Sequence, residues 1–401
     1  MDASAAPMPR LFAVADFRRL WTVGLIVFVV RWLEMLAVSL FVYQATGSAF
    51  LVTMMTLLRI LPMGLFGAIM GALAERVEAR SALVCIVLGS LGTSLVLALL
   101  AHAGVLAVWH LGVASFVNGL AWAADNPVRR LMIGHVVGPA RMGRAMSADV
   151  GSNNASRMFG PIASGVIFAT VGIEGTFALS VLLYLVALQA ALGLRYRSGV
   201  QPAAAEGVLA RIAEGVAAVR RDKRLQGTLA ITVIFNIWGW PFTSLVPVVA
   251  QDHLRLGPEA IGLLASMDGV GAFFGALAMA AWATPSNYGR CYIGGLVLYL
   301  LMIPLFALAP HPLAAGAALL LNGFGQAGFS VMQATLVYLL SPPELRSRVL
   351  GILSVCIGVG PIGFLHLGLL ADAIGAQWAC VVSALEGLLA LALTRRLWSK
   401  V

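Results

Sequence analysis

Long apolar stretches alternate with short polar segments along the whole chain. Twelve apolar runs can be marked, near residues 20–43, 49–74, 81–101, 105–124, 145–171, 175–194, 226–249, 258–283, 291–309, 313–340, 349–372 and 375–394. A helix needs about 20 mainly apolar residues to cross the hydrocarbon core of a bilayer. The pattern therefore predicts an all-α polytopic membrane protein with twelve transmembrane helices.

Composition supports this class and excludes soluble ones. Of the 401 residues, 60% are hydrophobic and 11% are charged, and the mean hydropathy is +0.94. Soluble domains are about 45–50% apolar and about 25% charged, so a water-soluble fold could not bury this much apolar surface. The lipid bilayer is therefore an expected partner.

Basic residues predict the orientation of the spans. The chain has 26 Lys and Arg against 17 Asp and Glu, a net charge of +9. Cytoplasmic loops of membrane proteins carry the excess of Lys and Arg. With both termini inside, all the basic residues except Arg31, Arg59, Arg157 and Arg255 fall in inner segments. We expect both termini to be cytoplasmic, and no nucleic-acid partner.

Residues typical of catalytic or metal sites form no recognisable pattern. The four cysteines lie in or beside apolar runs without metal-ligand spacing, as small buried hydrophobes do. A phosphate-binding Gly-rich loop with Lys-Ser/Thr, a metal-spaced His pair and a Ser-His-Asp set are all missing from the sequence. We therefore expect no enzyme activity, no cofactor and no metal, and transport without ATP.

The second half of the sequence repeats features of the first. Asn118-Gly119 matches Asn322-Gly323, 204 positions later, and Gly160-Pro161-Ile162 matches Gly360-Pro361-Ile362, 200 positions later. This ordered set indicates duplication of a six-helix unit, an arrangement that places substrate sites near the midplane between the halves. It predicts an N-terminal six-helix bundle over 1–197, a cytoplasmic linker over 198–224 and a C-terminal six-helix bundle over 225–401.

The linker itself is predicted to contain an amphipathic helix. Val208, Ile212, Val216 and Val219 recur at helical spacing among charged residues, which suits a helix on the inner membrane surface. Its basic end, Arg220 to Arg224, would face lipid headgroups. A plain topology-fixing linker and a regulatory partner site remain the two functional interpretations.

The loop after the second run resembles the signature loop of the major facilitator superfamily. It reads Gly71-Ala72-Leu73-Ala74-Glu75-Arg76-Val77-Glu78-Ala79-Arg80, in which Glu75 stands where Asp is usual and Glu78 where Gly is usual. The resemblance implies a gating role for Gly71, Glu75, Arg76 and Arg80, with Glu75 and Arg76 engaging the inner end of span eleven around 346–349. Gly160 and Pro161 look like part of the antiporter motif of drug-exporting facilitators.

Three further stretches resemble the branch of that superfamily that holds enterobactin-exporter-like and macrolide-efflux-like proteins. They cover residues 42–49, 118–129 and 341–349. The resemblance implies a monomeric secondary active exporter of a siderophore-like or drug-like small molecule in the inner membrane of a bacterium, driven by protons through alternating access. An importer or lysolipid flippase on the same fold and a non-transporting receptor remain alternatives.

Polar residues inside the spans are the candidate site. Such residues are costly in a bilayer and usually functional. The substrate-binding candidates are Arg31, Arg59, Trp122, Asn126, Asn153, Asn154, Arg157, Asn236, Trp240, Gln326 and Gln333. Glu34, ahead of Asp268, is the candidate for proton coupling, although Arg31 and Glu34, three residues apart, could simply neutralise each other. Three arginines against two carboxylates favour an anionic or amphipathic substrate.

Overall fold

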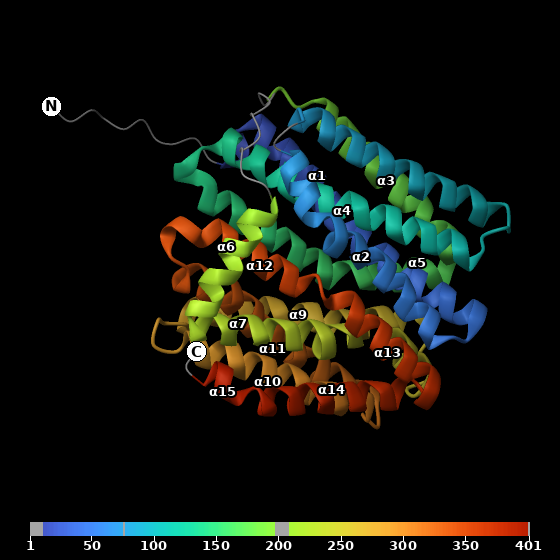
Figure 1. Ribbon diagram of the computed structural model, residues 1–401. Coiled ribbons are helices and arrows are strands. Elements are labelled where there is room, and N and C mark those ends of the chain that lie inside the picture. The colour runs from blue at the N-terminus through green and yellow to red at the C-terminus, as the bar shows by residue number, and fades with distance from the viewer. Residues whose placement is uncertain (1–10, 75–76, 197–207, 400–401) are drawn as a thin grey trace.

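The computed structural model describes residues 11–74, 77–196 and 208–399, and it shows helices but no β-strands in these residues. The helices run roughly side by side along one common direction (Figure 1). A short 3-10 helix, η1 (Leu11–Ala13), precedes α1. The helices of the first half are α1 (Ala15–Thr46), α2 (Ala49–Ala74), α3 (Ala79–His102), α4 (Val108–Val137) and α5 (Pro139–Leu192).

The second half begins with α6 (Val208–Arg221) and contains several short or interrupted helices. Its seventh run is broken into four pieces, α7 (Lys223–Ile234), the π-helix η2 (Phe235–Gly239), the 3-10 helix η3 (Trp240–Ser244) and α8 (Val246–Asp252). Then follow α9 (Pro258–Trp282), α10 (Tyr288–Ala307), α11 (Pro312–Leu340), η4 (Pro343–Leu345), α12 (Arg346–Ile357), α13 (Gly360–Ile374), α14 (Ala376–Leu393) and α15 (Arg395–Trp398).

The twelve predicted spans can be followed through the described residues. By length and hydropathy alone, eight helices could cross a membrane, or nine when the bent pair formed by Lys223–Ser244 and Val246–Asp252 is one span. The other three are α4, α11 and the second arm of α5. The helices α4 and α11 are less apolar because they carry cavity-facing polar side chains such as Asn126 and Gln326.

The long element α5 is a helical hairpin that supplies two spans. Gly172 interrupts it with φ 75° and ψ −165°, a conformation that glycine adopts without steric cost. The two arms therefore return to the same end of the molecule, where Arg80 donates a hydrogen bond of 2.7 Å to the carbonyl of Leu192. We call this end, which also holds α6 and α15, the terminal end, and the opposite one the far end (Figure 1).

Two groups of helices surround a central interface. In one group α1, α3 and α4 pack on α5, and in the other α9 and α10 pack on α11 while α14 packs on α10 and α13. The main contacts between the groups are α5 with α9 and α2 with α13. The division of the chain into an N-terminal six-helix bundle, a linker over 198–224 and a C-terminal six-helix bundle stays a prediction.

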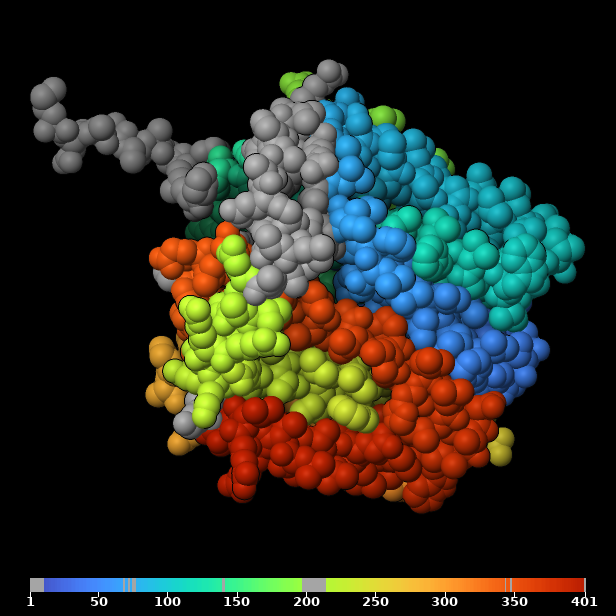
Figure 2. Space-filling view, in the orientation of Figure 1, coloured from blue at the N-terminus to red at the C-terminus, as the bar shows by residue number. Residues whose placement is uncertain are grey.

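The amphipathic helix expected in the linker forms as α6, and apolar side chains in its second half lie against protein. Ala218 and Val219 pack with Leu353 of α12, and a Cβ at Gly215 would lie 2.9 Å from the carbonyl oxygen of Arg348. Glu214 also forms an ion pair with Arg348. Figure 2 shows α6 seated against α12. The expectation that the apolar residues of this helix rest on lipid is therefore wrong for Ala218 and Val219, which pack on protein.

Candidate functional site

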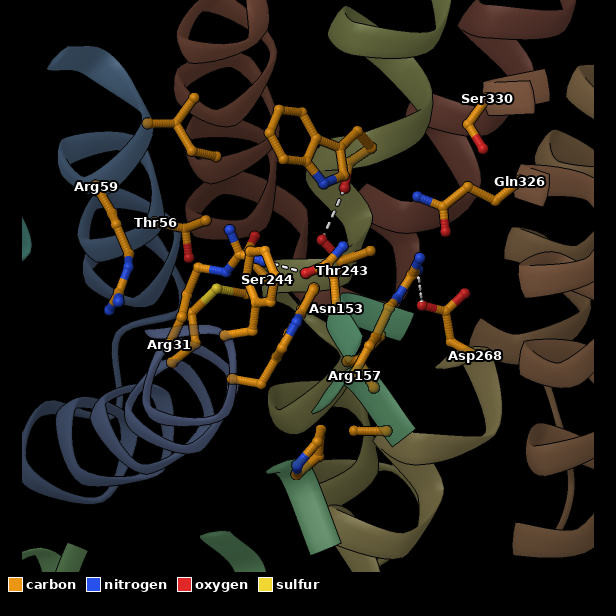
Figure 3. A pocket seen from close by; sticks show the side chains of 18 of the residues that line it. Arg31, Thr56, Arg59, Asn153, Arg157, Thr243, Ser244, Asp268, Gln326 and Ser330 are labelled. Carbon is orange, nitrogen blue, oxygen red and sulfur yellow. Dashed lines mark hydrogen bonds and ion pairs between the residues drawn. The ribbon is translucent and has the colours of Figure 1, made fainter. Parts of the chain in front are cut away.

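A cavity of about 420 Å³ lies between the two groups of helices. Its walls come from α1, α2, α4 and α5 on one side and from η2, η3, α9 and α11 on the other. Figure 3 shows the polar side chains that point into it. Small-molecule pockets in proteins are typically about 300–1,000 Å³, so the cavity has room for a drug-sized molecule.

Most of the predicted site residues line this cavity. They are Arg31, Arg59, Trp122, Asn126, Asn153, Arg157, Asn236, Trp240, Gln326 and Gln333, together with Asp268 and Pro161. Three others, Asn154, Gly160 and Glu34, are not part of the lining. Gly160 instead packs on α1, where a Cβ would lie 2.6 Å from the Cβ of Trp32.

Arg80, a residue of the predicted gating motif in the loop after α2, does not line the cavity. Glu75 and Arg76 fall outside the described residues, so their predicted contact with span eleven is not described. Gly71 is in the last turn of α2, and Arg80 is at the start of α3 at the terminal end. On span eleven, Arg346 lies over the ring of Tyr338, with 4.2 Å between the guanidinium carbon and the ring centroid.

An ion pair connects the two groups of helices across the cavity. Arg157 of α5 donates through Nη2 to Oδ2 of Asp268 in α9, and both side chains are about one-tenth exposed. The two helices touch here, because a Cβ at Gly269 would lie 2.8 Å from the backbone of Arg157. Asp268 Oδ1 has no hydrogen-bond partner in the described chain. The pair can therefore form only while α5 and α9 are close.

Arg31 provides a cation on the cavity wall. Its guanidinium donates to Oδ1 of Asn153 and lies over the ring of Trp122, 4.7 Å from the centroid. It is 8% exposed, and no carboxylate within the described ranges forms an ion pair with it. Aromatic faces stabilise a cation without cancelling its charge. Arg31 therefore remains able to pair with an anionic group in the cavity.

Glu34 faces the interior of the first helix group. Its carboxylate accepts hydrogen bonds from Ser94 at 2.9 Å and from Asn118 at 3.3 Å, and Arg59 lies 3.9 Å away. The idea that Arg31 and Glu34 neutralise each other is thus wrong for this structure. A spacing of three residues puts two side chains only about 60° apart around a helix with 3.6 residues per turn, so the spacing alone would allow them to pair. The helices that pack around α1 give Glu34 other partners instead. Arg31 points to the cavity and Glu34 to α3 and α4.

The sequence interpretation missed a buried ionic cluster beside the cavity. Arg129 is fully buried and donates to Asp125, 3.1 Å away, and to Asp149 of α5. Only Asp149 reaches the cavity lining. Asp125 and Arg129 fall in the polar segment between the fourth and fifth apolar runs, whereas α4 continues to Val137. The spacing of four between Asp125 and Arg129 was the available signal, since it suits a helical ion pair.

Comparisons with known proteins agree with this architecture. Residues 5–399 match the family described as transmembrane secretion effector. Macrolide efflux protein A of Streptococcus pyogenes is 20% identical over 371 residues, which cover 90% of each chain. The protein of that name from Enterococcus faecalis is 22% identical over 219 residues, 54% of this chain and 68% of the relative.

Solved structures of transporters show the same fold. A bacterial homologue of the human lysosomal transporter Spinster, in an inward-facing and unoccupied conformation, superposes with a TM-score of 0.76 at 12% identity, over 98% of this chain and 99% of the other. A POT family transporter in complex with a thioalcohol-conjugated peptide has a TM-score of 0.79 at 12% identity, over 96% of each chain. The chain therefore belongs to the transmembrane secretion effector family of the major facilitator superfamily and is a membrane transporter, not an enzyme.

Proposed function

We propose that the protein is a proton-coupled exporter of a small amphipathic anion in a bacterial inner membrane, with its terminal end in the cytoplasm. The names of its relatives support the direction of transport. The basic residues concentrated at the ends of spans support the orientation. Those relatives are named for macrolides. Because they are only 20–22% identical to this chain, we infer its substrate from the residues that line its own cavity.

The observation that carries the anionic substrate is Arg31. It is a buried cation with aromatic and amide neighbours, and it forms no ion pair with a carboxylate in the described chain. Asp125, itself bound to Arg129, acts on it electrostatically without contacting it. A cation at this depth without a contacting carboxylate is costly unless a ligand pairs with it. Trp122 and Trp240 add apolar surface to the same cavity, which suits a molecule with both an acidic group and a hydrophobic body.

The Arg157–Asp268 pair is the proposed point of proton coupling. Protonation of Asp268 would remove its charge, leave Arg157 without a partner and free both α5 and α9 to separate. Arg157 could then hold an anionic group of the substrate. Glu34 is less suited to this role, because it is 1% exposed and does not line the cavity. Asp268 is therefore preferred over Glu34 for proton coupling, whereas the sequence alone favoured Glu34.

Binding to purified transporter can test the anionic substrate. The probes are a fluorescent amphiphile with one carboxylate and its neutral amide analogue. Arg31→Gln is expected to weaken binding of the carboxylate by about 10- to 100-fold, the range expected for a charge-assisted hydrogen bond, and to leave the amide unaffected. Arg290→Gln removes the same charge at an exposed position outside the cavity and serves as the control. Equal loss for both probes would contradict the anionic substrate.

Transport in proteoliposomes tests the coupling separately. Asp268→Asn should abolish efflux driven by a pH gradient. It should preserve the movement of substrate down its own concentration gradient when no pH gradient is applied. If both Asp268→Asn and Glu34→Gln retain full gradient-driven efflux, neither carboxyl couples protons to transport. Uptake in place of efflux in cells that carry the wild-type protein would overturn the export direction and favour an importer.

A further inference from the structure

Outside the cavity, His366 of α13 and Glu386 of α14 form an ion-pairing contact that the transport site does not use. His366 Nε2 lies 2.6 Å from Glu386 Oε2. Their side chains are 36% and 37% exposed, and neither is among the side chains that line the central cavity. The exposed parts therefore face the outside of the helix bundle.

Both residues lie near the middle of the membrane. His366 is eight residues before the end of α13, which is roughly 12 Å along the helix, and Glu386 is ten residues after the start of α14, roughly 15 Å. The two helices meet at Gly375, where α13 ends. Two ionisable groups halfway across an apolar layer about 30 Å thick are expensive and point to a function.

The pair is joined to the broken seventh span through Trp238 of η2. Trp238 Nε1 donates to the same Glu386 oxygen, at 3.1 Å, and Ser383 donates to the carbonyl of Trp238, also at 3.1 Å. On the other side, a Cβ at Gly363 of α13 would lie 2.3 Å from the carbonyl oxygen of Ile237. The helices α13 and α14 thus hold η2 between them.

The same segment forms part of the cavity wall. Trp240 and Thr243 follow directly after η2 and line the cavity. A π-helix followed by a 3-10 helix has irregular hydrogen bonding and often marks a functional site. A small shift of η2 against α13 and α14 would therefore move Trp240 and Thr243 in the cavity wall.

The charge of the pair depends on how many protons it holds. With one proton it is neutral overall, either as imidazolium and carboxylate or as imidazole and carboxylic acid. Without that proton the pair is negative, and with a second proton it is positive. A carboxylate accepts hydrogen bonds from both His366 and Trp238, whereas a protonated carboxyl holds them less strongly. Proton occupancy thus changes how firmly Glu386 holds Trp238.

No other charged group competes for this pair in the described chain. Apart from His366, Glu386 forms a hydrogen bond with Trp238, which carries no charge. Arg59 of α2 is paired with Glu34, and Asp252 of α8 is bonded to Tyr43. The remaining charged residues on these helices and on those packed against them are Lys223, Arg224, Arg290, Asp372, Arg395 and Arg396, and none has a recorded contact with His366 or Glu386.

We propose that His366 and Glu386 form a proton-binding site on the membrane-facing side of α13 and α14, and that its occupancy sets the position of Trp240 and Thr243 in the cavity wall. The site is separate from the Arg157–Asp268 pair. It depends on neither the direction of transport nor the substrate proposed above.

Cysteine labelling without substrate or gradient tests this site, so the outcome does not depend on export. In full-length protein with the four native cysteines replaced by alanine, the maleimide reaction rate of a Thr243→Cys variant is compared with that of a Ser39→Cys variant. Both positions line the cavity, and Ser39 belongs to α1 in the other helix group. The ratio of rates is measured between about pH 5 and pH 8, where imidazole titrates.

We expect this ratio to change by about fivefold or more across the pH range, the lower end of ordinary coupling between two sites. His366→Gln and Glu386→Gln should both abolish the change. Trp238→Phe, which keeps the ring packing but removes the N–H group, should reduce it. His102→Gln is the control and should keep the pH dependence of the ratio. His102 and Glu174 form a similar contact of 2.7 Å, but their side chains are exposed and lie on α3 and α5, not beside η2.

The result that would overturn the proposal is a wild-type pH profile in His366→Gln or Glu386→Gln. Glu386→Gln is close in shape to the native residue and retains an acceptor oxygen for Trp238, so it decides the matter if His366→Gln does not fold. A wild-type profile in Trp238→Phe would show that the pair does not act on the cavity wall through η2.

Discussion

A close approach of the two helix groups near the far end offers a direct test of alternating access. Gly165 of α5 faces Gly262 of α9, and a Cβ at Gly165 would lie 2.5 Å from the carbonyl oxygen of Pro258 and 3.0 Å from the Cα of Gly262. Comfortable contacts between such atoms are about 3.5–4.0 Å. Gly165→Ala therefore requires the two helices to separate by about 1 Å.

The energetic cost of this substitution falls on one conformation. Overpacking by one methyl group typically costs about 1–3 kcal/mol, and the clash exists only while the far end is closed. The balance between closed and open far ends should therefore shift toward open by about 5- to 150-fold. The same substitution is not expected to affect packing within either helix group.

Distances between spin labels can measure this shift. Val105 and Leu313 are both exposed and lie at the far end, one in each helix group. Gly165→Ala is expected to add a population with a longer distance between labels at these positions. Gly151→Ala is the matched control, because Gly151 lies in the same α5 and its Cβ would meet no atom within 4 Å. An unchanged distance distribution in Gly165→Ala, or an equal shift in both variants, would refute the packing argument.

Three further outcomes are expected. Arg129→Met should lower the free energy of unfolding by about 3–5 kcal/mol, because it leaves Asp125 and Asp149 buried without their cation. A lower melting temperature in a thermal-shift assay is the expected result, and an unchanged one would contradict this. Glu214→Gln should change stability by less than about 1 kcal/mol, since its side chain is 49% exposed; a large loss would show that α6 holds α12 electrostatically. Trp122→Leu should weaken carboxylate-probe binding by about 2- to 5-fold in a fluorescence titration, through its contact with Arg31; unaltered affinity would exclude that contact from binding.

The membrane fold and many of the polar residues that line the cavity can be predicted from the sequence alone. Hydrophobic run length is a local property that the bilayer selects directly, so the twelve spans could be marked from it. Polar residues in spans are tolerated mainly where they face the interior of a bundle. That rule is sufficient to bring Arg31, Asn153 and Asp268 to one place.

Only the tertiary structure decided which charged groups meet. Arg157 and Asp268 are 111 positions apart, and their contact depends on how α5 lies against α9. Arg31 and Glu34 are close enough along α1 to pair, but Glu34 meets Arg59 of α2, at 3.9 Å, because α2 packs beside it. His366 meets Glu386 because α13 and α14 fold back on each other at Gly375. Helix periodicity fixes the face on which a side chain lies, whereas packing between helices decides which partner that face meets.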